Sequence, residues 1–323
     1  MSATVRINIP VAGTGLALRC PRCEHSLYRV SGTRAVCSHC NLSIPCENGI
    51  WRGILPERAG HFEQFIREYE FVRSKEGRGS SDAAYYLNLP YSDHTDRNAA
   101  QWKIRGTTFR YIEDRILPAI IRRKGHSPSI LDLGAGNCWL SYRLLIRGYR
   151  PVAVDLLTNE ADGLGAATFF RGSVPELFPR FQAELDRLPF ADNQFDMAIF
   201  NASFHYSEDF ARTLGESIRC LRPGGSVIIA DTAWYSNPDS GLRMVAERRQ
   251  AFRREYGFAS DSLCSLEFMT DARLTALERE FGIRWQIYRP FYGWRWHLRP
   301  LLAKLRGTRE PSRFRIYVAE VRK

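Results

Sequence analysis

After residue 128, apolar and polar residues alternate in a pattern that predicts strands separated by helices. A short apolar run leads into the turn Gly134–Gly136, and runs of strand length then alternate with amphipathic patterns up to residue 230. The predicted strands are Ile130–Leu133, Pro151–Val154, Met197–Phe200 and Val227–Ala230, and the predicted helices are Leu140–Ile146 and Leu214–Leu221. This alternation indicates an α/β fold with a parallel sheet covered on both faces. Such sheets bind ligands at the carboxyl ends of their strands.

Two helical patterns precede this part of the chain. Phe62, Phe65, Ile66, Tyr69 and Val72 recur at spacings of three and four residues, which predicts a helix packed on its neighbours. A second amphipathic pattern runs over residues 99–121, with Pro118 marking a kink or break.

The last forty residues predict a pair of strands separated by a long insertion. Ile283–Tyr288 and Phe314–Val321 have strand patterns, and the residues between them are rich in aromatic and basic side chains. If the first strand runs parallel to the rest of the sheet, it delivers this insertion, near residues 289–312, to the ligand-binding edge. Another helical pattern, over Gly241–Tyr256, predicts a helix over the pocket.

Composition narrows the class of protein. The 323 residues are 44% hydrophobic and 25% charged, which excludes wholesale disorder, collagen and coiled coil. No stretch approaches the roughly 20 apolar residues of a membrane-spanning helix. The N-terminus lacks the layout of a secretory signal, so we expect a cytoplasmic protein.

The net charge of +11 invites an anionic partner, but it is concentrated at one end. Residues 284–323 hold eleven lysines and arginines against two glutamates, a local net charge of +9. A protein covered by a nucleic-acid surface would spread this charge more widely. The basic segment therefore predicts a local contact with an anionic membrane surface, RNA or an anionic substrate, or simply a solvated helix.

Four of the eight cysteines form a metal-binding pattern. Cys20, Cys23, Cys37 and Cys40 have the spacing C-x2-C-x13-C-x2-C, in which each pair directs two thiolates at one tetrahedral ion. A dithiol redox pair or two disulfides would fit less well, because redox motifs are rarely doubled at this spacing and the cytosol opposes disulfides. The pattern predicts a structural zinc ion in a small N-terminal ribbon.

The glycine turn predicts a ligand site but not a dinucleotide site. Gly134 and Gly136 let the backbone approach a ligand, and Asp155 follows at the end of the next strand, where a carboxylate can accept hydrogen bonds from ribose hydroxyls. The dinucleotide motif requires a third glycine at the position of Trp139, which disfavours NAD or FAD.

Together these motifs resemble those of class I S-adenosylmethionine-dependent methyltransferases of the methyltransferase type 11 group. The resemblance rests on Ile130–Gly136 (ILDLGAG), Asp155, Leu188–Asp196 (LPFADNQFD) and Leu221–Gly225 (LRPGG). It implies a Rossmann-like, seven-stranded methyltransferase sheet with helices on both faces. The four-cysteine segment is similar to zinc ribbons that are fused or bound to some methyltransferases, including RNA-modifying ones.

The resemblance also implies roles for individual residues in binding S-adenosylmethionine. Asp155 would accept the ribose hydroxyls, and Glu184, where the family usually has aspartate, would face the adenine beside Leu185. Asp132 would orient the turn or meet the cofactor's amine. The residues left to hold the methionine part are Gly134, Ala135, Gly136, Asn137 and Asn201. Cys138 takes the place of a third glycine as a small tolerated residue.

Methyl transfer needs a base only if the acceptor must first lose a proton. His205, four residues after Asn201, is the candidate because its side chain titrates near neutral pH. A histidine that is merely hydrogen-bonded at the rim is an equal alternative. Tyr206, Asp231 and Tyr235 are further candidates for lining the pocket.

We expect a methyltransferase that acts on an O, N or C atom of a small-molecule or lipid-linked acceptor. The alternatives are an RNA methyltransferase that uses the ribbon and the basic segment, and a non-catalytic scaffold that binds cofactor or partner. Lipid binding would make the protein peripheral to the membrane, and the oligomeric state is open. The expected divisions are a zinc ribbon (1–57), a helical linker and cap (58–125) and the methyltransferase domain (126–323).

Overall fold

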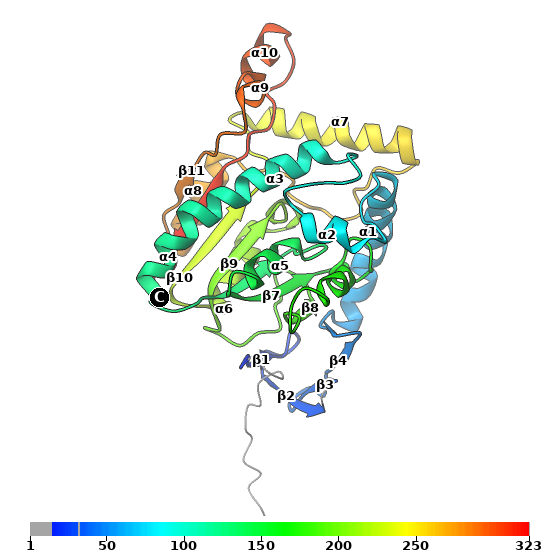
Figure 1. The fold of residues 1–323 in the computed structure, drawn as a ribbon, viewed down its shortest axis with the longest axis vertical. Helices are drawn as coiled ribbons and strands as arrows, with labels where there is room; N and C mark the ends of the chain where they lie inside the picture. The colour runs from blue at the N-terminus through cyan, green and yellow to red at the C-terminus, as the bar shows by residue number, and fades with distance from the viewer. Residues whose placement is uncertain (1–14, 32, 323) are drawn as a thin grey trace, which may run out of the picture.

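The computed structural model describes residues 15–31 and 33–322, so the first 14 residues of the expected ribbon and the last residue of the chain lie outside it. One sheet of 12 strands runs through this described part, in the spatial order β1-β2-β3-β4-β5-β8-β7-β6-β9-β10-β12-β11 (Figure 1). The strands before residue 57 are β1 (Leu18–Arg19), β2 (Ser26–Ser31), β3 (Arg34–Cys37), β4 (Ser43–Glu47) and β5 (Ile50–Arg52). The later strands are β6 (Ser129–Leu133), β7 (Arg150–Asp155), β8 (Arg180–Gln182), β9 (Phe195–Asn201), β10 (Leu221–Ala230), β11 (Gln286–Tyr288) and β12 (Ile316–Glu320).

Six neighbouring strands, from β5 across to β10, are parallel to one another. Strand β12 is antiparallel to both β10 and β11. The carboxyl ends of the parallel strands therefore share one edge of the sheet, where ligands bind in such folds. The four strands predicted between residues 130 and 230 are all present, and the short β8 was not predicted.

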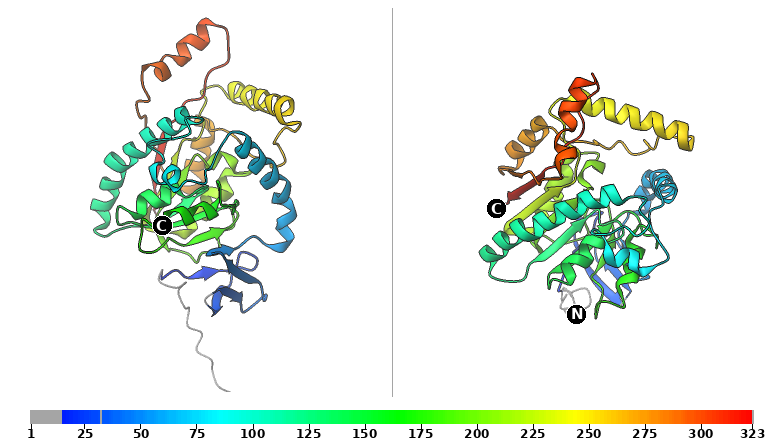
Figure 2. Two further views of the ribbon diagram at one scale, coloured as in Figure 1. Left: turned by 45° about the vertical axis from the view of Figure 1, so that its right-hand side comes forward. Right: turned by 45° about the horizontal axis from the view of Figure 1, so that its top comes forward.

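Helices cover both faces of the sheet (Figures 1 and 2). Before the central strand β6 they are α1 (Pro56–Lys75), α2 (Ala83–Asn88), α3 (Ala99–Tyr111), the π-helix η1 (Ile112–Ile116) and α4 (Leu117–Lys124). After it come α5 (Trp139–Leu145), the 3-10 helices η2 (Leu164–Phe170) and η3 (Phe204–Tyr206), α6 (Phe210–Cys220), α7 (Pro238–Tyr256), α8 (Asp271–Phe281), α9 (Trp294–His297) and α10 (Arg299–Leu305).

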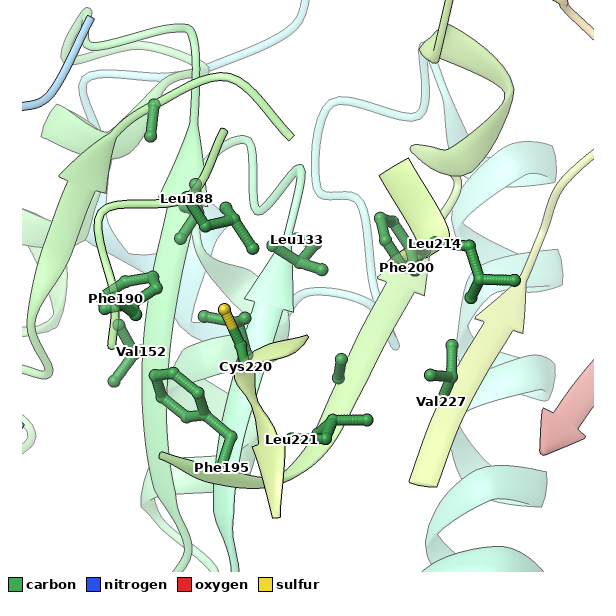
Figure 3. Close-up of a cluster of buried hydrophobic side chains, with 14 of the residues drawn as sticks. Leu133, Val152, Leu188, Phe190, Phe195, Phe200, Leu214, Cys220, Leu221 and Val227 are labelled. Atoms are coloured by element: carbon green, nitrogen blue, oxygen red, sulfur yellow. The ribbon is translucent and has the colours of Figure 1, made fainter. Parts of the chain in front are cut away.

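Alternate residues of the central strand face two separate apolar cores. Leu131 and Leu133 join the core that contains Leu214 of α6 and Leu277 of α8. Figure 3 shows part of this core, in which Leu133, Phe200 and Val227 of neighbouring strands lie on the same face of the sheet as Leu214. On the other face, Ile130 joins the core formed with α3 and α5. The period of two along a strand thus produces the two-sided burial that the apolar runs predicted.

The helix expected over residues 99–121 contains the predicted irregularity at Pro118. The chain stays helical from α3 through α4, but the intervening residues 112–116 form a π-helical turn. Proline has no N–H to donate to the carbonyl four residues earlier, which lies in this turn. The helix therefore continues past Pro118 through one π-helical turn and does not break.

The four-cysteine segment continues the same sheet instead of standing apart from it. Ile50 and Trp51 of β5 pair in parallel with Arg180 and Phe181 of β8. The rings of Trp51 and Phe181 stack with centroids 6.2 Å apart, inside the core that also holds Leu131. The described sheet therefore has 12 strands where we expected seven, because the segment's five strands extend it.

The insertion leaves the sheet at the edge that we predicted. Because β10 and β11 are both antiparallel to β12, β11 points in the same direction as the parallel strands. Its carboxyl end leads into α9 and α10, which project beyond the body of the molecule (Figures 1 and 2). Within the described residues, no helix is long and apolar enough to cross a membrane.

Candidate functional site

The turn after β6 leaves its backbone open on the ligand-binding edge. Gly134 and Gly136 have φ angles of +73° and +52°, in the left-handed region that favours glycine. A Cβ atom on Gly134 would lie 2.2 Å from Cβ of Ser203, so no larger residue fits there without a shift of the chain. Cys138 also has a positive φ, +64°, and precedes α5. Cys138, which the sequence motif aligns with a third glycine, thus also has a backbone conformation that suits glycine.

Asp155, at the end of β7, is fastened to the glycine turn. Its Oδ2 accepts a hydrogen bond from the Gly136 amide at 2.7 Å, and its Oδ1 accepts one from the Leu157 amide at 2.8 Å. Burial raises the pKa of Asp155 to about 6. The carboxylate still has lone pairs for a ligand, because each amide occupies one acceptor position on its oxygen.

Asp132 lies beneath the turn and does not line the cavity. Its side chain is 1% exposed, and its Oδ2 accepts a hydrogen bond of 2.7 Å from Oγ of Ser141 in α5. Burial raises the pKa of Asp132 to about 7. Of the two roles expected for Asp132, this position suits orienting the turn, whereas it gives the carboxyl no access to a ligand.

Glu184, after β8, has one satisfied and one unsatisfied oxygen. Both Nε and Nη2 of Arg58, in α1, donate to its Oε2 at 3.0 and 2.8 Å. Its Oε1 is buried and has no hydrogen-bond partner within the described structure. A buried carboxylate oxygen without a donor is energetically costly, so this atom fits a ligand that donates a hydrogen bond.

The remaining predicted residues complete the wall of one cavity. Asn137 donates from Nδ2 to Asp162 at 3.3 Å, and Asn201 donates from Nδ2 to Asp231 at 3.3 Å. The cavity opens at the carboxyl ends of β6 and β7. Its lining includes every residue predicted to bind cofactor except Asp132, namely Gly134, Ala135, Gly136, Asn137, Asp155, Glu184, Leu185 and Asn201.

Several lining residues were not predicted, and some of them come from helices α1 and α3, which lie between β5 and β6 in the chain. Tyr69 and Arg73 of α1 and Arg105 of α3 line this cavity, as does Asp162. Arg73 forms an ion pair with Asp162. The sequence contained a signal for both arginines, because each lies three or four residues from an apolar member of its helix pattern and hence on the apolar face.

Arg105 forms no close ion pair in the described part of the chain, although the charge of Asp231 acts on it. Its guanidinium lies 4.8 Å from the ring of Trp102. Burial lowers the pKa of Arg105, as do the neighbouring charges of Arg73 and Arg78, whereas the charge of Asp231 raises it. Arginine remains charged despite such shifts, so the position favours an anionic group on a ligand.

A second cavity adjoins the first. Tyr69, Arg105 and Tyr206 line both. The wall of the second cavity otherwise combines apolar and aromatic side chains with polar and charged ones. The larger apolar and aromatic residues are Phe65, Met244, Leu263, Phe252, Trp296 and Phe314, and the polar residues include Glu76, Gln101, Asp231 and Glu267. Its other arginines are ion-paired: Arg73 with Asp162, Arg78 with Glu76, and Arg248 with Glu267.

His205, the predicted catalytic residue, lines the second cavity and not the first. Its Nδ1 is buried without a hydrogen-bond partner in the described structure. Burial lowers the pKa of His205 from 6.5 to about 4, so the imidazole is neutral at pH 7. Of the other rim candidates, Tyr206 lines both cavities and Asp231 lines the second.

The four predicted metal ligands lie together in the N-terminal part of the sheet. The sulfur atoms of Cys20, Cys23, Cys37 and Cys40 all lie within 4.8 Å of one another. The Cys20–Cys40 and Cys23–Cys37 sulfur pairs are 3.6 and 3.4 Å apart. Four thiolates around a tetrahedral zinc ion, each about 2.3 Å from the metal, would be separated by similar distances.

Comparisons with known proteins agree with the motifs. Residues 131–229 match a family described as a methyltransferase domain. An uncharacterized methyltransferase of Mycobacterium tuberculosis is 37% identical over 145 residues, which cover 44% of this chain and 51% of that protein. A malonyl-[acyl-carrier protein] O-methyltransferase of Methylococcus capsulatus is 32% identical over 145 residues, covering 44% of this chain and 48% of that protein.

Among solved structures, a 1,6-didemethyltoxoflavin-N1-methyltransferase of Burkholderia thailandensis is 16% identical, with a TM-score of 0.45. The alignment covers 92% of this chain and 99% of that one. The chain spans about half the length of the curated relatives it matches. The match over residues 131–229 agrees with the motifs, which predicted a methyltransferase domain.

Proposed function

We propose that the protein is an S-adenosylmethionine-dependent methyltransferase that acts on a small-molecule or lipid-linked acceptor. The observation that carries this proposal is the first cavity. Eight of the nine residues predicted to bind the cofactor line it, and the segment around them matches a methyltransferase domain.

The polar groups of the first cavity suit each part of the cofactor. Oε1 of Glu184 would accept a hydrogen bond from the adenine amine, and Asp155 would accept hydrogen bonds from the ribose hydroxyls. Arg105 would neutralise the carboxylate of the methionine part, which the open backbone of the glycine turn admits. Every group with an unmet hydrogen bond or charge thus has a counterpart in the cofactor.

When bound, S-adenosylmethionine supplies a methyl group on a positively charged sulfur, ready for in-line displacement. The chain's own contribution is to position the two reactants, which is worth about 7–11 kcal/mol in well-oriented pairs. The second cavity would hold the acceptor, because it adjoins the first through Tyr69, Arg105 and Tyr206.

His205 would accept the acceptor's proton where one must leave. Its low pKa keeps the imidazole unprotonated at neutral pH, and its unpaired Nδ1 leaves an acceptor atom available. The same low pKa makes it a weak base, which suits an acceptor that loses its proton readily.

The lining of the second cavity favours a metabolite over RNA. Apolar and aromatic side chains form a large part of the wall, and the arginines other than Arg105 are already paired with carboxylates. An RNA site would instead present unpaired cations along the path of the phosphates.

The proposed divisions of the chain follow the expectation from the sequence. The segment up to residue 57 would bind a structural zinc ion through its four cysteines, and residues 58–125 would form the helical cap. Residues 126–323 would form the methyltransferase domain, whose seven strands are β8, β7, β6, β9, β10, β12 and β11.

The test is calorimetric titration with S-adenosylhomocysteine, the reaction product. Wild-type protein should bind it in the micromolar range, and Asp155→Ala should abolish binding. The matched control is Asp114→Ala, which removes an exposed carboxylate outside the cavity and should bind like wild type. If wild type fails to bind, or if Asp155→Ala binds equally well, the proposal is wrong.

A further inference from the structure

The projecting insertion carries an exposed apolar stripe. We call residues 289–312, with helices α9 and α10, the arm. Leu298 joins these helices and has helical dihedral angles, φ −80° and ψ −12°. The arm's exposed large apolar side chains are Phe291 (54% exposed), Trp294 (73%), Leu298 (48%), Leu301 (55%), Leu302 (43%) and Leu305 (74%).

The spacing of these residues places them on one side of the helix. Counted from Trp294, the leucines follow at +4, +7, +8 and +11, which is the periodicity of one helical face. Exposed cations flank this face at Arg295, Lys304 and Arg306. No aspartate or glutamate occurs between Glu280 and Glu310.

The opposite side of the arm is already occupied by the rest of the protein. The ring of Trp296 stacks on that of Phe314, outside the arm, with centroids 5.3 Å apart. Hydroxyl groups of Tyr292 and Thr108 lie 2.9 Å apart, at hydrogen-bond distance, which ties the start of the arm to α3. The arm is thus anchored through one face while its leucine stripe points away from the body.

An apolar stripe flanked by cations has the chemistry of a helix that lies in the surface of an anionic bilayer. A second copy of the chain is a poorer partner, because two arms would bring cations together with no acid between them. RNA would use the cations and the aromatic rings but would leave four exposed leucines without a role. We propose that the arm docks the protein on an anionic lipid surface.

Docking would place the acceptor cavity beside the lipid. Trp296, on the anchored face of the arm, and Phe314, next to the arm's end, both line the second cavity. A lipid-linked acceptor would then enter from the bilayer. This consequence rests on the proposed function, whereas docking itself does not.

The experiment is sedimentation of the full chain with vesicles of phosphatidylcholine, with and without phosphatidylglycerol. Wild type should bind the anionic vesicles, and raised salt or neutral vesicles should weaken binding. The double variant Leu301→Glu with Leu305→Glu should bind the anionic vesicles at least about tenfold more weakly, since burial of the stripe drives insertion. The matched control is Ile146→Glu, which adds a carboxylate at an apolar residue that is 45% exposed and lies at the end of α5.

Two results would overturn docking: no binding of wild type to anionic vesicles, or equal binding by the double variant. Tight binding of a single-stranded RNA oligonucleotide without vesicle binding would assign the arm to RNA instead. Titration of the double variant with S-adenosylhomocysteine checks that its fold is intact. Vesicle binding by a wild-type protein that does not bind S-adenosylhomocysteine would uphold docking and refute the proposed function.

Discussion

At the scale of single residues, two side chains in the first cavity have unmet interactions. Glu184 has a buried oxygen without a donor, and Arg105 forms no close ion pair in the described structure, with only the more distant charge of Asp231 to offset its own. Both groups raise the free energy of the protein when no ligand is bound, and a ligand with complementary groups would lower it. They therefore indicate which end of the cofactor each residue holds.

Methylthioadenosine separates these two contacts, because it lacks the amino-acid part of the cofactor. Arg105→Gln should weaken binding of S-adenosylhomocysteine about 10- to 100-fold, since a hydrogen bond to a charged group contributes about 1.5–3 kcal/mol. The same variant should leave the affinity for methylthioadenosine unchanged. Calorimetric titration of both ligands measures the difference.

Two further variants serve as comparisons for this prediction. Glu184→Gln should weaken binding of both ligands, because both contain adenine. Lys103→Gln, on an exposed position of the same helix as Arg105, should change neither affinity. An equal loss of both ligands in Arg105→Gln would contradict the assignment of Arg105 to the carboxylate.

The low pKa of His205 predicts a pH-dependent loss of stability. In the unfolded chain the imidazole titrates near 6.5, whereas in the folded protein burial lowers its pKa to about 4. Between these values the unfolded state binds more protons, so folding stability falls as the pH drops. Relative to His205→Gln, wild type should lose about 2 kcal/mol between pH 7 and pH 5. Urea unfolding at both pH values measures this, and a constant difference between the two proteins would refute the buried, neutral imidazole.

At the scale of elements, the periodicity of apolar residues was a good guide to the sheet and its helices. The predicted strand Met197–Phe200 is the core of β9, and the predicted helix Leu140–Ile146 matches α5 within one residue at each end. Strand β8 was not predicted because it has only three residues and begins with a charged residue, Arg180. The side chain of Arg180 is buried nonetheless, because it donates hydrogen bonds to the carbonyl oxygens of Leu164 and Asn48. Such bonds come from distant parts of the chain, so no local pattern reveals them.

The hairpins that hold the four cysteines are elements too short to keep their shape through their own packing, so we expect metal to stabilise them. Wild-type protein should contain stoichiometric zinc by elemental analysis, and Cys37→Ser should lose it. Cys264→Ser, which removes an exposed thiol outside the cluster, should retain it. Stoichiometric zinc in Cys37→Ser would show that the four-cysteine assignment is wrong.

At the scale of the whole molecule, the four-cysteine segment and the cofactor cavity belong to one body. Strand β5 pairs with β8, and Arg58, six residues after β5, bonds to Glu184 in the cavity wall. Loss of zinc in Cys37→Ser should therefore lower the single thermal transition of the chain, by roughly 5–10 °C, instead of creating a separate early transition. Scanning calorimetry of the two cysteine variants distinguishes these outcomes.

The sequence by itself determined the features that depend on local chemistry. Four features could be predicted because each depends on residues close together in the chain. They are the glycine turn, Asp155, the four-cysteine spacing and the alternation of strands and helices. The tertiary structure alone decided that Arg105 of α3 and Arg73 of α1 enter the cofactor cavity, and that His205 faces the adjoining one. It also decided that the N-terminal hairpins extend the sheet and that the leucines of the arm stay exposed. These outcomes depend on which surfaces meet when the chain folds, and that is set by packing between distant segments.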